Sequence, residues 1–248
     1  MRALIFAAGL GTRLRPITDS IPKALVEVGG VAMLGRVIDK IAGASVTRIA
    51  VNAHHFPDKI IDYVRSYKCP KDVTLTVSDE RDYLLETGGG LAKLLADTGI
   101  DEDILVHNAD ILTDFPIGEM MSLHRDSGAD ITLLAQRRDT TRYLLFDADM
   151  RMHGWNNAKT DEVRPSGVIA TSYVRFAFGG VHILSPRAQR RLLEYSGGVR
   201  KFSIIDFYVD CCRDLVIKGY VPEKDYLWID IGKPESLELA CRYFGGRH

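Results

Sequence analysis

A glycine-rich loop with basic side chains around it follows the first apolar segment of the chain. The apolar run of residues 3–8 leads into Gly9-Leu10-Gly11-Thr12-Arg13, and Arg15 and Lys23 follow at short distances in sequence. Because glycine has no Cβ, such a loop brings backbone N–H groups close to a ligand. Clustered N–H groups form an anion-binding concavity, which the three cations reinforce. The spacing therefore predicts a polyphosphate-binding loop.

Two acidic residues stand where other predicted strands end. Asp110 closes the segment Asn108-Ala109-Asp110 after an apolar run, and Asp230 lies in Trp228-Ile229-Asp230-Ile231-Gly232-Lys233-Pro234. Mg²⁺ is commonly bound by one or two carboxylates together with phosphate oxygens and water. The two acids therefore predict a magnesium site that a phosphate substrate completes. The alternative is that each aspartate caps the turn or helix that follows it.

Two other phosphate-binding loops do not fit this sequence. In the dinucleotide-binding pattern G-x-G-x-x-G the third glycine position is Leu14 here. The acid expected after the second strand is missing as well, since that strand ends in Asn52-Ala53-His54. No G-x-x-x-x-G-K-[ST] segment occurs, which excludes a Walker loop.

The glycine-rich loop resembles the signature of the sugar-1-phosphate nucleotidylyltransferases, also called nucleoside-diphosphate-sugar pyrophosphorylases. In that family a G-x-G-T-R-L-x-P loop is followed by P-K. The matching residues here are Gly9 to Pro16, Thr18, Pro22, Lys23 and Leu25. The resemblance covers nearly the whole chain and is strongest up to residue 110, from 176 to 184 and from 226 to 236. It implies transfer of a nucleoside monophosphate from a nucleoside triphosphate to a sugar 1-phosphate, with release of pyrophosphate.

The resemblance also implies roles for single residues. Arg13 would hold the β- and γ-phosphates and Lys23 would bridge the triphosphate and the sugar phosphate, while Arg15 is either a phosphate contact or a surface charge. Mg²⁺ on Asp110 and Asp230 would clamp the α-phosphate. Many members have Gly-Asp where this chain has Ala109-Asp110. The residues implied in nucleotide binding are Ala8, Gly9, Gly11, Thr12, Glu86, Gly88 and Gly89.

Two further segments resemble substrate-binding parts of the family. Leu85-Glu86-Thr87-Gly88-Gly89-Gly90 is similar to the L-E-T-G-G-G segment of the short uridylyltransferases, which contacts base and ribose; a glycine-rich helix start is the alternative. Phe178-Gly179-Gly180-Val181 resembles the F-x-G segment whose glycine faces the sugar, which implies Gly180. The E-K-P lysine of longer relatives is absent. Lys159 lies in the corresponding region, although a solvated loop lysine accounts for it better.

The chain is most similar to short N-acetylmuramate-1-phosphate uridylyltransferases of cell-wall recycling. UTP is the expected donor, because three consecutive glycines at 88–90 would place backbone groups against uracil. The alternatives are a mannose- or heptose-1-phosphate guanylyltransferase that uses GTP, and a catalytically silent protein that binds a nucleotide sugar. The four charged residues of the predicted site argue against the silent alternative, and the missing E-K-P keeps it open.

Composition limits the partners and the compartment. The 248 residues carry 32 Lys and Arg against 33 Asp and Glu, a net charge of −1, so no basic field favours nucleic acid. No stretch approaches the roughly 18 apolar residues of a membrane span, and Arg13 interrupts any signal-like start. The four cysteines have no C-x-x-C spacing. We expect a cytoplasmic protein, a monomer or small homo-oligomer, whose partners are a nucleoside triphosphate and a sugar 1-phosphate and include neither nucleic acid nor membrane.

The elements that must position these residues alternate between strands and helices. Apolar runs predict strands at 3–8, 49–51, 73–77, 103–107 and 131–134. Helical spacing predicts helices that contain Met33 to Ile41, Ile60 to Val64, Leu91 to Leu95 and Met120 to Leu123. This order predicts an α/β fold, a mostly parallel, doubly wound sheet with helices on both faces, Rossmann-like and, by the resemblance, GT-A-like. Ligands collect beyond the carboxyl ends of such strands, where the loops can converge.

The pattern changes after about residue 140. We expect a hairpin over 143–155, a mobile loop over 156–172, and a long strand from Tyr173 to Leu184. Gly179-Gly180 interrupts this strand and indicates either a bulge or the close approach of a ligand. Helices at 185–195, 203–214 and 234–243 and a strand at 226–230 would complete the chain. The prediction is one nucleotidyltransferase domain over 1–248, with a nucleotide-binding half at 1–135 and a sugar-phosphate-binding half at 136–248 that includes a small β-rich subregion.

Overall fold

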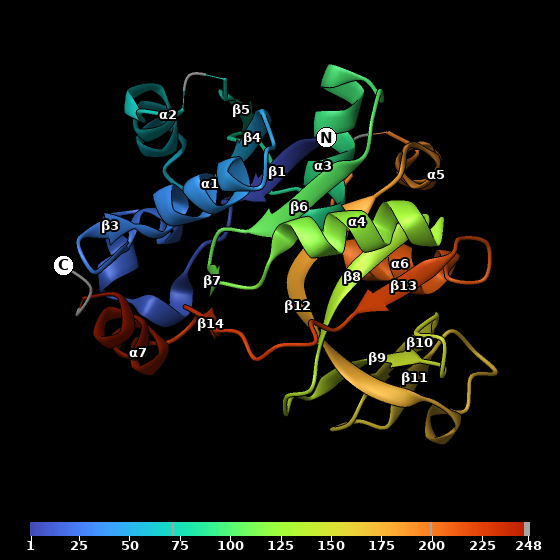
Figure 1. The fold of residues 1–248 in the computed structure, drawn as a ribbon. Coiled ribbons are helices and arrows are strands. Elements are labelled where there is room, and N and C mark those ends of the chain that lie inside the picture. Colours follow the sequence, from blue (N-terminus) through green and yellow to red (C-terminus); the bar gives the residue numbers. More distant parts are fainter. Residues whose placement is uncertain (71, 199, 246–248) are drawn as a thin grey trace. The chain divides into compact units, whose positions relative to one another are not determined.

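A computed structural model describes residues 1–70, 72–198 and 200–245 and divides the chain into two compact units (Figure 1). The first unit contains Met1–Leu85, Val106–Ile117 and the chain from Lys224 onward. The second contains Glu86–Leu105 and Gly118–Glu223. Each unit is therefore built from segments that are separated in sequence. The functional halves at 1–135 and 136–248 divide the chain differently and stay a prediction.

The first unit is built on a parallel β–α–β–α–β arrangement. Strands β1 (Arg2–Phe6), β4 (Arg48–Ala53) and β5 (Thr74–Asp79) pair in parallel in the order β1-β4-β5. The crossover helices are α1 (Met33–Gly43) and α2 (Pro57–Ser66). All these elements lie where the apolar spacing predicts them.

The crossover helices owe their positions to local sequence. Helix α1 buries apolar side chains at helical spacing, from Met33 to Ile41. Helix α2 begins with Pro57 in its first turn, where the missing N–H costs nothing, and it buries Ile60 and Val64.

Short ribbons complete the first unit. Strands β2 (Glu27–Val28) and β3 (Val31–Ala32) form a small hairpin. Strand β6 (Ile104–Asn108) leads from the second unit into the first, and β7 (Ile111–Thr113) follows it at once. Strand β7 pairs antiparallel with β14 (Trp228–Asp230), and helix α7 (Pro234–Gly245) follows β14. The sequence predicted β6, β14 and α7 but not β7.

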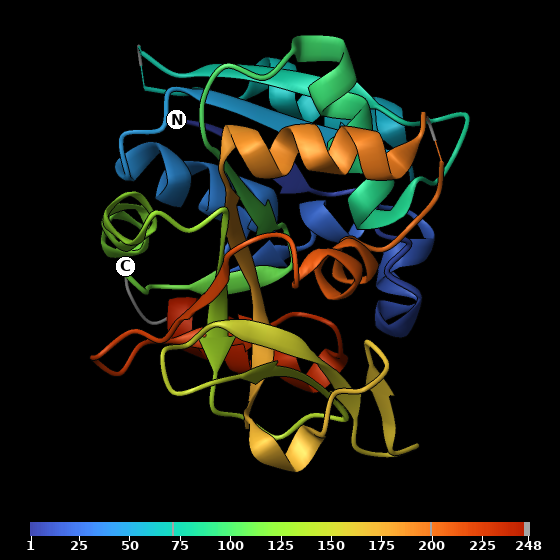
Figure 2. The same ribbon diagram turned by 90° about the vertical axis from the view of Figure 1, so that its right-hand side faces the viewer.

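The second unit combines helices with a mixed sheet. Strand β12 (Val174–Leu184) pairs antiparallel with both β8 (Ile131–Gln136) and β9 (Arg142–Phe146). Strands β10 (Met152–Asn157) and β11 (Glu162–Arg164) extend the antiparallel part, as Figure 2 shows in yellow beside the gold β12. The remaining elements are the parallel partner of β8 and four helices: β13 (Ile217–Tyr220), α3 (Glu86–Thr98), α4 (Ile117–Ser127), α5 (Pro186–Ser196) and α6 (Ile204–Cys211).

The expected α/β class with a mostly parallel, Rossmann-like sheet is confirmed, and details of the second unit differ from the expectation. The predicted loop 156–172 contains β11 and a 3-10 turn at Ala170–Ser172. Helix α3 begins at Glu86, so the three glycines lie inside its first turns and not ahead of it. The bulge at Gly179-Gly180 is confirmed, because the β12–β8 register shifts between Phe178 and His182. Among the described residues, no helix has the length and apolar character needed to cross a membrane.

His107 is a buried polar residue of β6, just before the segment that carries Asp110. Its Nδ1 donates to the carbonyl oxygen of Asn108 at 2.8 Å, and its Nε2 is buried without a hydrogen-bond partner among the described residues. Burial lowers the pKa of His107 from 6.5 to about 4. The imidazole is therefore neutral at pH 7, which is the state expected of a histidine in the core.

The lowered pKa of His107 predicts a loss of stability in mild acid. Between pH 6.5 and about 4 the unfolded chain binds a proton that the folded chain does not, so the free energy of unfolding falls as the pH falls. This one group contributes at most about 1.4 kcal/mol per pH unit. We expect His107→Gln to reduce the slope when urea unfolding is measured at pH 7, 6 and 5. Equal slopes for the variant and the parent protein would contradict the assignment.

Candidate functional site

The glycine-rich loop begins where β1 ends and folds into 3-10 turns at Thr12–Leu14 and Ile17–Asp19. Gly11 has a left-handed backbone with φ of 66°, and its carbonyl oxygen accepts a hydrogen bond from Thr18 Oγ1 at 2.8 Å. A Cβ on Gly11 would lie 2.9 Å from Thr18 Cγ2 and 3.0 Å from Lys23 Cβ. Both the backbone conformation and the space therefore require glycine.

Lys23 and Asp110 form an ion pair through Nζ and Oδ2. Lys23 opens a 3-10 turn after Pro22, and its side chain is only 11% exposed, against 30% for Asp110. The chain just before Asp110 is fixed to the end of β1, because the N–H of Ala109 donates to the carbonyl oxygen of Phe6 at 3.0 Å. The pair is therefore held at the carboxyl end of β1.

The β7–β14 ribbon brings Asp230 next to Asp110. Asp230 stands opposite Ile111 in the ribbon, and the N–H of Ile231 donates to the carbonyl oxygen of Asp110 at 2.9 Å. The opposite end of the ribbon is closed by Thr113 Oγ1, which donates to the carbonyl oxygen of Leu227 at 2.6 Å. The backbones that carry the two aspartates are thus neighbours.

Arg13 reaches the same place from the glycine-rich loop. A Cβ on Gly232 would lie 2.7 Å from Arg13 Nη2 and 2.9 Å from Asp230 Oδ1. The guanidinium and the carboxylate therefore both border Gly232. The structure brings the four predicted charged residues together within the first unit: Arg13, Lys23, Asp110 and Asp230.

The donor set fits a magnesium ion that shares its ligands with a phosphate. The described residues contain no group of three or more His, Cys, Asp or Glu side chains that could hold a metal. Two adjacent aspartates supply carboxylate oxygens, which Mg²⁺ prefers when phosphate and water complete its shell. Asp110 and Asp230 are the residues that would hold it.

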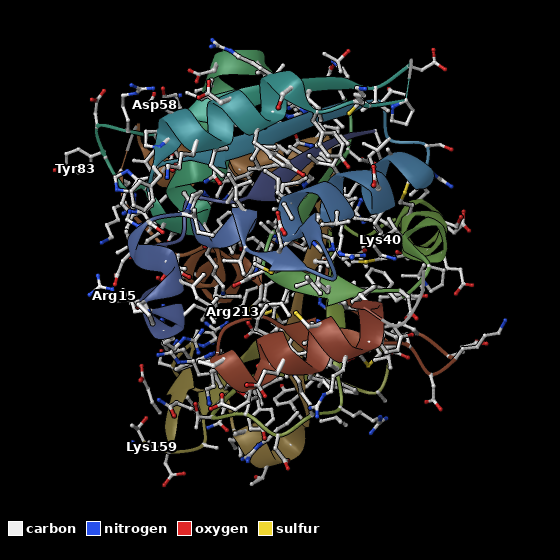
Figure 3. The ribbon with its side chains drawn as sticks, turned by 90° about the vertical axis from the view of Figure 1, so that its left-hand side faces the viewer. Arg15, Lys40, Asp58, Tyr83, Lys159 and Arg213 are labelled. Carbon is white, nitrogen blue, oxygen red and sulfur yellow. The ribbon has the colours of Figure 1, made fainter. Side chains whose placement is uncertain are left out.

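The other predicted loop residues follow the same turn. Ala8 is 7% exposed, while Gly9 and Thr12 are exposed, and a Cβ on Gly9 would meet no atom within 4 Å. Arg15 lies on the outside of the loop and is directed away from the molecule (Figure 3); its Nε is 3.2 Å from Asp19 Oδ1. Of the two expectations for Arg15, these contacts favour a surface charge.

The predicted base-binding segment lies in the second unit and has local packing of its own. Glu86 has a left-handed φ of 58°, and its Oε1 is 3.4 Å from Lys201 Nζ. The N–H groups of Gly88 and Gly89 donate to the carbonyl oxygen of Phe202 at 2.9 and 3.3 Å. A Cβ on Gly88 would lie 2.3 Å from the Phe202 ring. Packing against Phe202 thus explains Gly88, and the roles of these three residues in nucleotide binding stay predictions.

The two predicted sugar-phosphate residues also belong to the second unit. Gly180 has a left-handed φ of 76° within the irregular part of β12, a conformation that favours glycine without any ligand. Lys159 is exposed on the turn between β10 and β11 (Figure 3), where its backbone N–H donates to Asn157 Oδ1 at 3.0 Å. Their contacts with a sugar phosphate stay predictions.

Sequence reasoning gave no role to four residues that shape the site. Thr18 and Gly232 belong to the recognised motifs, and the structure shows that they support Gly11 and make room for Arg13. Asn52 and Glu80 are buried polar residues at the carboxyl ends of β4 and β5. A polar residue that ends an apolar strand was the signal that could have found them.

Comparisons with known proteins show the family of the chain and its fold. The chain matches the family model described as nucleotidyl transferase over residues 2–243. The N-acetylmuramate alpha-1-phosphate uridylyltransferase of Caulobacter vibrioides is 29% identical, over 96% of this chain and 94% of that protein. A mannose-1-phosphate guanyltransferase of Yarrowia lipolytica is 33% identical over 98% of this chain but only 64% of its own length. The solved structure of a UDP-glucose pyrophosphorylase from Acinetobacter baumannii has the same fold, with a TM-score of 0.81 and 16% sequence identity. The match covers 100% of this chain and 94% of that chain.

The contact between Gly232 and Arg13 predicts a specific effect on anion binding. In Gly232→Ala the new methyl group lies 2.7 Å from Arg13 Nη2 and 2.9 Å from Asp230 Oδ1, so the ends of these two flexible side chains must move. We expect a nucleoside triphosphate to bind about 10-fold more weakly, a loss of about 1.4 kcal/mol, while the thermal midpoint changes little. Isothermal titration calorimetry measures the affinity. Gly43→Ala is the control, since a Cβ on Gly43 meets open space. Unchanged affinity in Gly232→Ala would show that Arg13 does not hold the anion.

Proposed function

The chain belongs to the nucleotidyl transferase family, and we propose that it transfers uridine monophosphate from UTP to an N-acetylmuramate-1-phosphate-like sugar. It is an enzyme of the sugar-1-phosphate nucleotidyltransferase class, which forms a nucleotide sugar. The observation that carries the proposal is the convergence of Arg13, Lys23, Asp110 and Asp230 beside the glycine-rich loop.

The reaction needs alignment and charge neutralisation more than proton transfer. An oxygen of the sugar phosphate attacks the α-phosphorus, a new P–O bond forms, and the bond to the pyrophosphate group breaks with its electron pair. Because the nucleophile is already an anion, no general base is required. In the proposed mechanism Arg13 binds the β- and γ-phosphates and stabilises the charge that moves onto them. Lys23 lies between the two anionic substrates and reduces their repulsion.

Before substrate binds, the charges of Lys23 and Asp110 neutralise each other in their ion pair. When bound, Mg²⁺ would neutralise α-phosphate oxygens and hold them in place. Asp110 and Asp230 would bind the ion, and the Lys23 ammonium would then turn from Asp110 to the phosphates. The buried stem of Lys23 keeps its position through this exchange of partners, which limits the reorganisation that the reaction requires.

The metal role of Asp110 predicts the behaviour of Asp110→Asn. We expect this variant to bind nucleotide measurably and to lose Mg²⁺-dependent turnover by a factor on the order of 10² or more, because a neutral amide holds Mg²⁺ poorly. Pyrophosphate release is measured across a magnesium titration, with Asp114→Asn as the control from the same region. Turnover that persists in a chelator would remove the metal from the mechanism.

The choice of UTP now rests on similarity rather than on the three glycines. The N–H groups of Gly88 and Gly89 are already bonded to Phe202, so they are not free to read a base in the described state. The proposal is supported by the Caulobacter uridylyltransferase, which this chain covers almost end to end. The guanyltransferase relatives keep GTP as the second candidate, since the Yarrowia protein is also similar over 98% of this chain.

Nucleotide choice is tested directly by binding. We expect UTP to bind at least 10-fold more tightly than GTP, CTP or ATP in calorimetric titrations with Mg²⁺ and without sugar phosphate. A matrix of the four triphosphates against several sugar 1-phosphates, read by pyrophosphate release, then identifies the acceptor. Tightest binding of GTP would favour the mannose- or heptose-1-phosphate alternative. Binding without turnover across the whole matrix would favour the silent homologue.

We place the enzyme in the cytoplasm and in the supply of nucleotide sugars for cell-wall recycling. All four cysteines, Cys69, Cys211, Cys212 and Cys241, are free, which suits a reducing compartment. Burial raises the pKa of the adjacent thiols of Cys211 and Cys212, which fits inert core residues rather than a redox pair.

A further inference from the structure

Asn52 links the start of the glycine-rich loop to the neighbouring strand. It lies near the carboxyl end of β4 and is 2% exposed. Its Oδ1 accepts hydrogen bonds from the backbone N–H groups of Ala7 at 2.7 Å and Ala8 at 3.2 Å. Its Nδ2 donates to Glu80 Oε1 at 3.0 Å. One buried amide therefore joins the exit of β1 to the exit of β5.

The network fixes which way the amide points. Two N–H donors face one end of the Asn52 side chain and a carboxylate faces the other, so only one orientation satisfies every partner. Glu80 is itself held in place, because its N–H donates to the carbonyl oxygen of Ala53 at 2.7 Å. His54 Nδ1 donates to the carbonyl oxygen of Glu80, also at 2.7 Å. Glu80 is thus a fixed acceptor that orients Asn52.

The two N–H groups that Asn52 binds are of the kind that bind anions. Successive backbone N–H groups directed at one point form an anion-binding concavity. Here both N–H groups already donate to Asn52 Oδ1, so they are not available to a phosphate while these bonds last. The first residues of the loop are also held at a fixed place relative to β4.

We propose that Asn52 and Glu80 are a positioning pair that sets the geometry of the glycine-rich loop for the triphosphate. Neither side chain needs to touch substrate: Glu80 orients Asn52, and Asn52 holds Ala7 and Ala8. The pair thereby determines where Gly9, Gly11 and Arg13 meet the phosphates. The proposal rests on the loop being the polyphosphate site, but it does not depend on which base or sugar the enzyme uses.

Exchange of the two functional groups tests the pair. Asn52→Asp keeps the acceptor for Ala7 and Ala8 but sets two carboxylates 3.0 Å apart, so the orientation of residue 52 is lost. We expect kcat/KM to fall on the order of 100-fold, mostly through kcat, because a displacement of about 1 Å in a positioning group has an effect of this size. In Asn52→Asp with Glu80→Gln, the new amide at 80 donates to the new carboxylate at 52. We expect this double variant to regain at least 10-fold of the loss.

A second variant keeps the test decisive if Asn52→Asp folds poorly. Asn52→Ala removes the acceptor without adding a charge, and we expect it to weaken nucleoside triphosphate binding at least 10-fold in calorimetry. Glu80→Gln should not rescue Asn52→Ala, since no side chain remains at 52 to be oriented. Thermal unfolding of each variant separates loss of fold from loss of position. Wild-type affinity and turnover in Asn52→Ala, or no recovery in the double exchange, would overturn the proposal. Nucleotide binding by the parent protein without turnover would instead contradict the proposed function.

Discussion

The ion pair between Lys23 and Asp110 joins parts of the chain that are 87 residues apart, and much of the first unit serves to hold it. The Lys23 stem can lie where it does only because Gly11 leaves room for it. Two backbone hydrogen bonds hold Asp110 in place. The N–H of the preceding residue, Ala109, donates to the carbonyl oxygen of Phe6, and the N–H of Ile231 donates to the carbonyl oxygen of Asp110. The side chains of Lys23 and Asp110 are 11% and 30% exposed. A partly buried ion pair of this kind adds little to stability unless its geometry is fixed, and these backbone contacts fix it.

The sequence was sufficient to predict that the four charged residues lie close together, because most of their positions follow from a simple rule. Arg13, Lys23 and Asp110 follow short apolar strands, and parallel strands deliver such loops to one edge of a sheet. Asp230 instead ends β14, and the antiparallel ribbon with β7 brings it to Asp110. The motif spacing singled out Arg13 and Lys23, and the structure places both beside the two aspartates, while their roles with phosphates stay predictions. The same rule did not reveal β7 or β13, strands of three and four residues whose pairing partners lie far away in sequence.

Gly88 and Asn52 show why the other contacts around the site could not be predicted from the sequence. A glycine is explained by what occupies the space of its missing Cβ, and for Gly88 that is Phe202, a residue of a distant segment. The pattern of three glycines suggested a surface for a base, but helix packing accounts for Gly88 equally well. Asn52 looked like the absence of a ribose-binding acid. Its partners, Ala7, Ala8 and Glu80, directly follow two other strands, β1 and β5, and meet Asn52 only in the folded unit.

The charges of the site balance before any substrate is bound, since two cations stand beside two carboxylates. The chain as a whole carries a net charge of −1, so no long-range field draws in a polyanion. Attraction must therefore arise at short range, from the N–H groups of the loop and from exchange of ion-pair partners. In the proposed mechanism, Asp110 and Asp230 would bind the divalent cation that accompanies the triphosphate, and Lys23 would then be available to the phosphates. Because both exchanges occur among groups already in place, the site can be neutral when empty and still be organised for a highly charged reaction.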